Sequence, residues 1–293
     1  MKSVARIVIL TVALVACGLF QAAAQPHARG DFEFGRYLLG NGLLRDAKTL
    51  AESDFNAELY TPAALDSLSH LKGWTLYNLR DFGGAVGHLG RVASSSPLYA
   101  KSAFYAAVSS VELGDYEVAE QLLGAFEKSP ARADYGELLA FERAGVALLQ
   151  GDTDLYKSLS KQFTYSDFAL ADEERALDMI ASTKPRNLSP WVAGVASAVV
   201  PGLGQIYAGN IGEGVASFLL VGAMAGLTAE SWVKAGTPAN LRTILYGSVG
   251  TLLYIGNICG GVASVKLYYK QFDETLSEAV VCSLHIPLRS IFK

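Results

Sequence analysis

Hydrophobic and polar positions divide the chain into a mixed N-terminal part and an apolar C-terminal part. Between residues 26 and 187, apolar side chains recur every three or four positions, as at Leu138, Phe141 and Ala144, which is the spacing of one helix face. Between residues 188 and 268, long apolar stretches leave only five charged residues. The pattern predicts an all-α protein in which a soluble helical part precedes a membrane-embedded helical part.

Three stretches of the C-terminal part carry no formal charge: residues 187–212, 214–229 and 243–265. A membrane-spanning helix needs about 20 predominantly apolar residues. The third stretch meets this length. The second meets it once it is extended to Val233, which places Trp232 at the level of the lipid headgroups. These two stretches predict two clear spans.

The first uncharged stretch is interrupted near its centre by a proline and a glycine. Proline lacks the backbone N–H that a helix uses, and glycine tolerates positive φ, so we expect a half-helix, a tight turn and a new helix. This is a broken or re-entrant segment, and whether residues 190–209 cross the bilayer stays open. We expect Gly202 and Gly204 to take positive φ, and Gln205 and Tyr207 to satisfy the freed backbone groups. The predicted turn residues are Pro201, Gly202, Gly204, Gln205, Tyr207 and Gly209.

Small residues four apart occur in both predicted spans. Gly222 and Gly226 form one such pair, and Gly256 and Gly260 form another. This spacing lets two helices approach closely in a membrane. We expect packing within one hairpin, with homo-oligomerisation as the alternative. Asn257 is the most polar side chain in the last span, and we expect it to join helices by hydrogen bonds rather than to bind a transported substrate.

The N-terminus has the pattern of an export signal. Lys2 and Arg6 precede an apolar run over residues 7–16, which is too short to span a bilayer comfortably. The small residues before Gln25 predict a signal peptide over residues 1–24. A lipobox-like sequence ending at Cys17 leaves lipidation of that cysteine as the alternative. Both predict that the following domain is exported.

A motif with a small or polar turn followed by a helical alanine recurs in the soluble part. It appears at residues 80–85 and 113–119, where Ala85 and Ala119 are 34 residues apart. An earlier copy covers residues 42–47, and a looser fourth copy covers residues 150–155. A helix pair cannot bury its apolar face alone, so such units must stack on their neighbours.

The period of 34 residues resembles that of tetratricopeptide (TPR) repeats. Gly73 and Leu76 match the first helix of a unit, Leu89 matches the second, and Pro97 closes it. The fourth copy departs most, with Tyr156 where alanine is expected. The resemblance implies a stack of helix pairs over residues 25–170 whose groove binds a protein or peptide partner.

The broken segment resembles the entry motif of bacterial TM2-like membrane domains. The resemblance rests on the PGLGQ sequence at residues 201–205 with Tyr207 and Gly209, and on a second glycine-rich segment at residues 254–261. The loop at residues 234–238 lacks the charged turn of that family. Envelope proteins often pair such a segment with TPR-like repeats. The resemblance implies a membrane location and no established activity.

The remaining boundaries follow from these assignments. We expect a linker over residues 171–187, a membrane domain over residues 188–270 and a C-terminal tail over residues 271–293. The net charge of −4 excludes a nucleic-acid binder that relies on bulk basic charge, and three cysteines exclude a disulfide scaffold.

The sequence carries no recognisable catalytic pattern. The four histidines have no metal-ligand spacing, and the Gly-rich stretch at residues 83–90 lacks the lysine of a phosphate-binding loop. The Ser-x-x-Lys sequence at residues 158–161 lacks its companion motifs. The sequence predicts a non-enzymatic protein without a cofactor, metal or catalytic residues.

These observations favour a scaffold of the bacterial cell envelope. We expect an integral protein of the inner membrane, in contact with the lipid bilayer, whose repeats lie in the periplasm and bind a protein or peptide. The alternative is an oligomeric component of a membrane transport or translocation system, since broken helices mark binding sites in transporters. Basic residues flank both ends of the membrane part and the loop between its spans, so the positive-inside rule leaves the side of the tail open.

Overall fold

The computed structural model describes residues 32–52 and 61–292 and confirms the all-helical prediction, since these residues form helices and contain no strand. The chain divides into two compact units. The first unit comprises Met1–Ser182 with Ala279–Lys293, and the second comprises Thr183–Glu278. The predicted signal peptide, with Cys17, lies outside the described residues.

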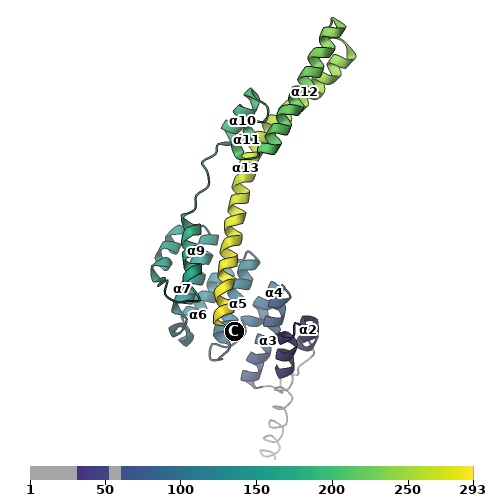
Figure 1. Ribbon diagram of the computed structural model, residues 1–293. Coiled ribbons are helices and arrows are strands. Elements are labelled where there is room, and N and C mark those ends of the chain that lie inside the picture. Colours follow the sequence, from purple (N-terminus) through teal and green to yellow (C-terminus); the bar gives the residue numbers. More distant parts are fainter. Residues whose placement is uncertain (1–31, 53–60, 293) are drawn as a thin grey trace, which may run out of the picture. The chain divides into compact units, whose positions relative to one another are not determined.

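Helices follow one another along the first unit, and most of them pack against the next (Figure 1). Residues 32–40 are helical and precede α2. Short 3₁₀ turns, η2 (Pro130–Ala133) and η3 (Ser160–Gln162), follow α6 and α8. The longer helices are α2 (Leu44–Glu52), α3 (Pro62–Asn78), α4 (Phe82–Leu89), α5 (Tyr99–Glu112), α6 (Tyr116–Glu127), α7 (Gly136–Leu149), α8 (Thr153–Leu159) and α9 (Ala171–Ser182).

The same turn joins the two helices of three consecutive pairs. Gly114 and Gly151 each have a φ of 74°, and each is followed by an aspartate that accepts a hydrogen bond from the third residue beyond it. This aspartate caps the N-terminus of the second helix. Arg80, with a φ of 60°, occupies the corresponding place before Asp81. The fourth sequence copy therefore has the same local geometry as the second and third.

Small residues bring the helices of a pair into contact. Ala85 and Ala119 are completely buried. A Cβ atom added to Gly73 would lie 2.5 Å from Leu89 Cγ and 2.9 Å from the Leu89 backbone nitrogen. Gly73 thus lets α3 touch the backbone of α4, which a larger residue would prevent.

The linker expected over residues 171–187 is shorter in the structure, because its first part is helix α9. Leu177 is completely buried in the core of the first unit. The Tyr156 hydroxyl donates a hydrogen bond of 2.6 Å to Asp178 Oδ1 on α9. The linker prediction relied on the acidic start of this segment and overlooked its apolar face.

The second unit contains α10 (Pro190–Val199), α11 (Leu203–Ala208), α12 (Ile211–Ala235) and the greater part of α13 (Leu241–Ile291). Helices α12 and α13 are long and apolar enough to cross a membrane. They pack against each other through Gly250, whose added Cβ would lie 3.4 Å from Met224 Cβ, and through a bond from Thr243 Oγ1 to Ser231 Oγ.

The separate C-terminal tail expected over residues 271–293 is wrong as a structural element. Helix α13 continues without interruption from Leu241 to Ile291 and includes Pro287. Its last residues belong to the first unit, where Val280, Leu284 and Leu288 are buried. We call residues 279–292 the C-terminal segment. Its apolar side chains at four-residue spacing complete the core of the first unit.

Candidate functional site

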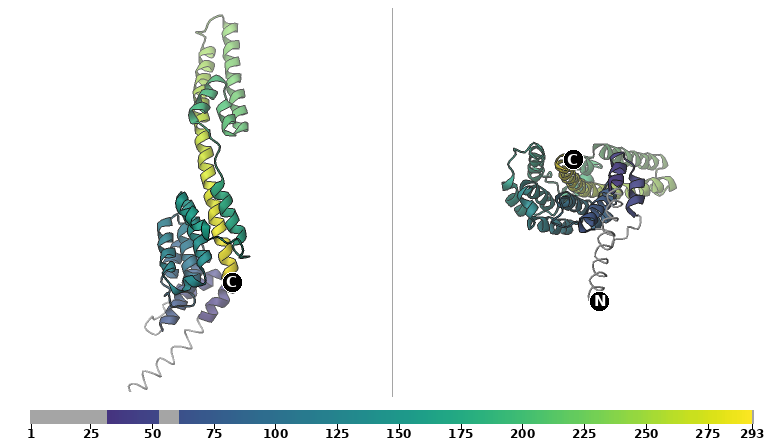
Figure 2. Two further views of the ribbon diagram at one scale, coloured as in Figure 1. Left: turned by 90° about the vertical axis from the view of Figure 1, so that its left-hand side faces the viewer. Right: turned by 90° about the horizontal axis from the view of Figure 1, so that it is seen from below.

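The C-terminal segment lies against the first helices of three consecutive pairs, α3, α5 and α7. We call the surface of these helices that contacts the segment the docking face. In both views of Figure 2, the C-terminal end of α13 lies beside helices of this unit. The docking face therefore holds a helical segment of the chain itself.

Apolar contacts along the docking face follow one side of the segment. Leu284 is completely buried, and a Cβ atom added to Gly145 of α7 would lie 2.5 Å from its Cδ2 atom. The ring of Phe292 lies 5.9 Å from the ring of Phe104 and 5.3 Å from that of Tyr135, measured between centroids. Glycine at position 145 thus leaves the space that the leucine fills.

A chain of polar contacts crosses the docking face at His285. The Tyr77 hydroxyl donates to His285 Nδ1 at 2.7 Å, and His285 Nε2 donates to Glu112 Oε1 at 2.8 Å. This assignment requires the imidazole tautomer with its hydrogen on Nε2, because a carboxylate only accepts. Tyr77 comes from α3 and Glu112 from the end of α5, so one histidine joins the segment to two helices.

Glu142 of α7 is a second acidic group near this face. Its side chain is buried, and its Oε1 atom has no hydrogen-bond partner. Burial raises the pKa of Glu142 well above its usual range. Burial also raises the pKa of Tyr77, and the carboxyl groups of Glu112 and Glu142 add to this increase. Burial thus favours the protonated form of the Glu142 carboxyl.

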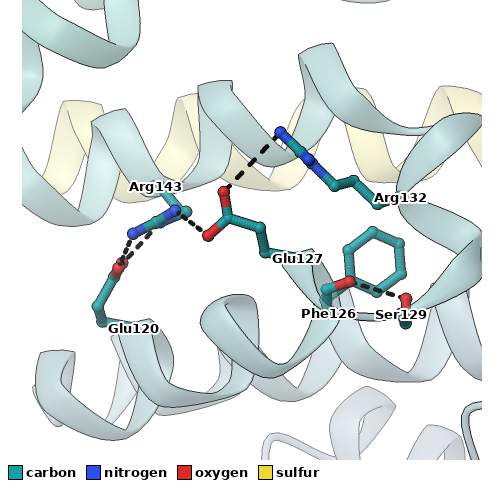
Figure 3. Close-up of polar contacts among 6 residues, drawn as sticks. All are labelled: Glu120, Phe126, Glu127, Ser129, Arg132 and Arg143. Carbon is teal, nitrogen blue, oxygen red and sulfur yellow. Dashed lines mark hydrogen bonds and ion pairs between the residues drawn. The ribbon is translucent and has the colours of Figure 1, made fainter.

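An ion-pair network joins α6 to α7 (Figure 3). Arg143 donates from Nε to Glu120 Oε1 at 2.9 Å and from Nη1 to Glu127 Oε2 at 2.8 Å. Arg132 lies 3.9 Å from the other oxygen of Glu127. The Arg143 side chain is 19% exposed, so these charges are partly shielded from water and hold the two helices in register.

Two carboxyl groups anchor the loop between η3 and α9. Glu137 Oε1 accepts hydrogen bonds from the Thr164 amide at 2.9 Å and from the Thr164 hydroxyl at 2.6 Å. Glu174 Oε2 accepts one from the amide of Tyr165, a residue with a φ of 53°. Burial, and then the hydrogen bond and charge of Glu137, raise the pKa of Glu174 to about 7.

In the second unit, the predicted turn residues lie between α10 and α12. Helix α10 ends at Val199, Pro201 follows, and α11 begins at Leu203. Gly202 and Gly209 have φ values of 89° and 104°. A Cβ atom on Gly202 would lie 1.9 Å from the carbonyl oxygen of Gly214, so the turn brings two backbones into contact.

The expectation of positive φ at Gly204 is wrong, since that residue lies inside α11 and is not among the residues with positive φ. Glycine is required there for space. An added Cβ would lie 2.2 Å from the carbonyl oxygen of Ala193 and 2.4 Å from Ser197 Oγ. Gly204 lets α11 fold back onto α10.

The groups that satisfy the freed backbone of the turn also differ from the expectation. The Gly202 amide donates to Asn257 Oδ1 at 2.7 Å, and the Gly204 amide donates to Ser197 Oγ at 3.0 Å. Gln205 instead donates from Nε2 to the Asn257 carbonyl oxygen at 3.2 Å and accepts from Ser197. Tyr207 accepts a bond from the amide of Ser189.

Asn257 joins helices, because its Nδ2 atom also donates to the carbonyl oxygen of Ser197 at 3.0 Å. Ser197, Gln205 and Asn257 are all buried. The sequence alone gives Ser197 no role, since a serine in an apolar stretch does not show which amide it will meet. These three side chains satisfy one another and the turn.

The predicted packing glycines have different environments. Cβ atoms added to Gly222, Gly226 or Gly256 would meet nothing within 4 Å, so packing of these three within the hairpin is wrong. Gly260 lies against Gln205 Nε2, at 3.0 Å from its added Cβ. Among the glycines of α13, the closest approach falls at Gly261, where an added Cβ would lie 2.4 Å from Ser197 Oγ.

Across the described ranges, no group of three or more His, Cys, Asp or Glu side chains is placed to hold a metal ion. Comparisons of the chain with models of protein families, with curated proteins and with solved structures gave no match.

Proposed function

We propose that this protein is a non-enzymatic scaffold of the bacterial cell envelope, in which TPR-like repeats bind a protein or peptide partner and α12 and α13 anchor the chain in a membrane. The observation that carries the proposal is the packing of the C-terminal segment on the docking face. A surface made of the first helices of successive pairs already holds an amphipathic helix, and stacked helical repeats commonly use such surfaces for binding.

The membrane anchor rests on the length and apolarity of α12 and α13, together with their exposed apolar side chains. Leu219, Val233 and Leu252 are each more than 60% exposed. Exposed apolar surface of this kind requires a lipid or protein cover. We place the anchor in the inner membrane and the repeats in the periplasm.

A transport role has no comparable support from the second unit. The polar side chains at the broken segment, Ser197, Gln205 and Asn257, are buried and bonded to one another and to the turn. Such a cluster supports a structural role, because a transport site needs polar groups that are free to meet the substrate.

Photo-crosslinking in intact cells tests the scaffold function. A photoreactive residue replaces Trp74, which lies on α3 beside Tyr77 and Tyr105. The matched control replaces Phe168, which is fully exposed on the loop before α9. We expect a discrete adduct from position 74 and none from position 168. Absence of any adduct from position 74, with the protein present in the membrane fraction, would contradict the proposal.

A further inference from the structure

The contacts of the C-terminal segment define a side-chain pattern. Leu284, His285, Leu288 and Phe292 occupy positions i, i+1, i+4 and i+8; the first three lie in α13, and Phe292 directly follows its last residue. Both leucines are completely buried on the docking face, and Phe292 reaches its aromatic residues. The pattern is compact, and any amphipathic helix that carries it presents the same chemistry.

Charge on the docking face complements this pattern. The carboxylate of Glu112 accepts from His285, and the buried carboxyl of Glu142 lies near the same face, close enough to act on Tyr77. The basic groups nearby are Arg289 of the segment itself and Arg80 at the turn before α4, whose charges act on His285. Because the docking face presents carboxyl groups and aromatic side chains, it favours a helix with a histidine or another hydrogen-bond donor at the second position of the pattern.

The segment contacts the docking face on one side only. Cys282, Ile286 and Ser290 lie on its opposite side and are exposed. Because the segment is held through one face, its separation from the docking face leaves the contacts between the paired helices in place. The docking face is thus suited to the exchange of one bound helix for another.

We propose that α3, α5 and α7 form a receptor for amphipathic helices with this Leu-His-x-x-Leu-x-x-x-aromatic pattern, that the C-terminal segment is its resident occupant, and that a partner helix binds by displacing the segment. The inference rests on the proposed scaffold function and names the chemistry of the partner. It makes the docking face autoinhibited in the free protein.

The test uses the full-length protein in detergent micelles and a fluorescent peptide that reproduces residues 279–293, with serine in place of Cys282. Leu284→Arg ejects the resident segment, because a charged side chain cannot occupy the space beside Gly145. We expect this variant to bind the peptide at least tenfold more tightly than the wild-type protein. Ser290→Arg, on the exposed side of the same segment, is the matched control and binds like the wild type.

A second ejecting variant, His285→Glu, places a carboxylate against Glu112 and leaves Leu284 in place, so the test does not depend on one substitution. Helix content by circular dichroism verifies that each variant is folded. A peptide carrying Leu284→Arg must fail to bind either variant. The proposal is overturned if folded ejecting variants bind the peptide no better than the wild type, or if the altered peptide binds equally well.

The outcomes separate this inference from the scaffold function. Peptide binding to the ejecting variants without any cellular adduct from position 74 would remove the scaffold function and leave the receptor chemistry standing. Adducts in cells without peptide binding would support a partner of different chemistry and remove the present inference.

Discussion

Gly202→Ala tests how the broken segment is held together. The substitution adds one carbon atom at a residue with a φ of 89°, where the left-handed backbone costs an L-residue about 1–2 kcal/mol. The loss of a flexible glycine from the unfolded chain offsets about 0.4–1 kcal/mol of this. The backbone term alone is therefore small.

Contact with Gly214 dominates the expected effect. The added carbon would lie 1.9 Å from the Gly214 carbonyl oxygen and 2.7 Å from its carbonyl carbon. These are backbone atoms, so no side-chain rotation relieves the overlap, and the turn must shift away from α12. The shift also strains the buried bond from the Gly202 amide to Asn257. Overpacking contributes about 1–3 kcal/mol and the buried bond about 1–3 kcal/mol, so we expect a loss of about 3 kcal/mol or more.

The first measurement is the unfolding of the full-length protein in mixed micelles as denaturing detergent is added, monitored by circular dichroism. The second is the abundance of the protein in the membrane fraction. Gly222→Ala is the matched control, because its added carbon meets nothing within 4 Å inside the same unit. The control should be at least as stable as the wild type, since alanine favours a helix over glycine. Equal stability of Gly202→Ala and Gly222→Ala would refute the steric reasoning.

Three further predictions address the first unit. Because the pKa of Glu174 is raised to about 7, its protonated carboxyl stabilises the folded unit at low pH, and this contribution is lost as the pH rises from 4.5 to 7. The unfolding free energy of Glu174→Gln should therefore increase relative to that of the wild type by on the order of 2 kcal/mol across this interval. A difference in urea unfolding that stays constant with pH would contradict this prediction. Arg80→Gly should raise the unfolding free energy by about 0.5–1 kcal/mol, because glycine tolerates the φ of 60° at this position. Gly114→Ala should lower the unfolding free energy by about 1 kcal/mol, because alanine does not favour positive φ. If both substitutions changed the stability in the same direction, the turn argument would be wrong. Arg143→Ala should lower it by about 1–3 kcal/mol, because Glu120 and Glu127 lose their shared partner, and a variant as stable as Arg132→Ala would show that the network in Figure 3 contributes little.

Local features of the structure were accessible from the sequence by itself. Helical periodicity predicted helices in both units, and the described residues are helical. The turns at Asp115 and Asp152 depend on a preceding glycine with positive φ and on an N-cap hydrogen bond from the third residue beyond the aspartate. Each turn is therefore encoded within a few neighbouring positions. The break after Val199 likewise follows from adjacent Pro201 and Gly202, because a missing N–H and a positive φ act on the backbone where they occur.

Only the tertiary structure decided which surface covers each apolar face. Gly202 meets Asn257 across 55 positions of the chain, and Leu284 fills the space beside Gly145, a residue from a different helix. Periodicity identifies an apolar face but not the segment that packs on it. For this reason the sequence alone predicts a tail separate from the first unit, and it places Gly222 in the contact between the two spans. The choice among covers depends on shape and hydrogen bonding between distant segments, and those exist only once the chain has folded.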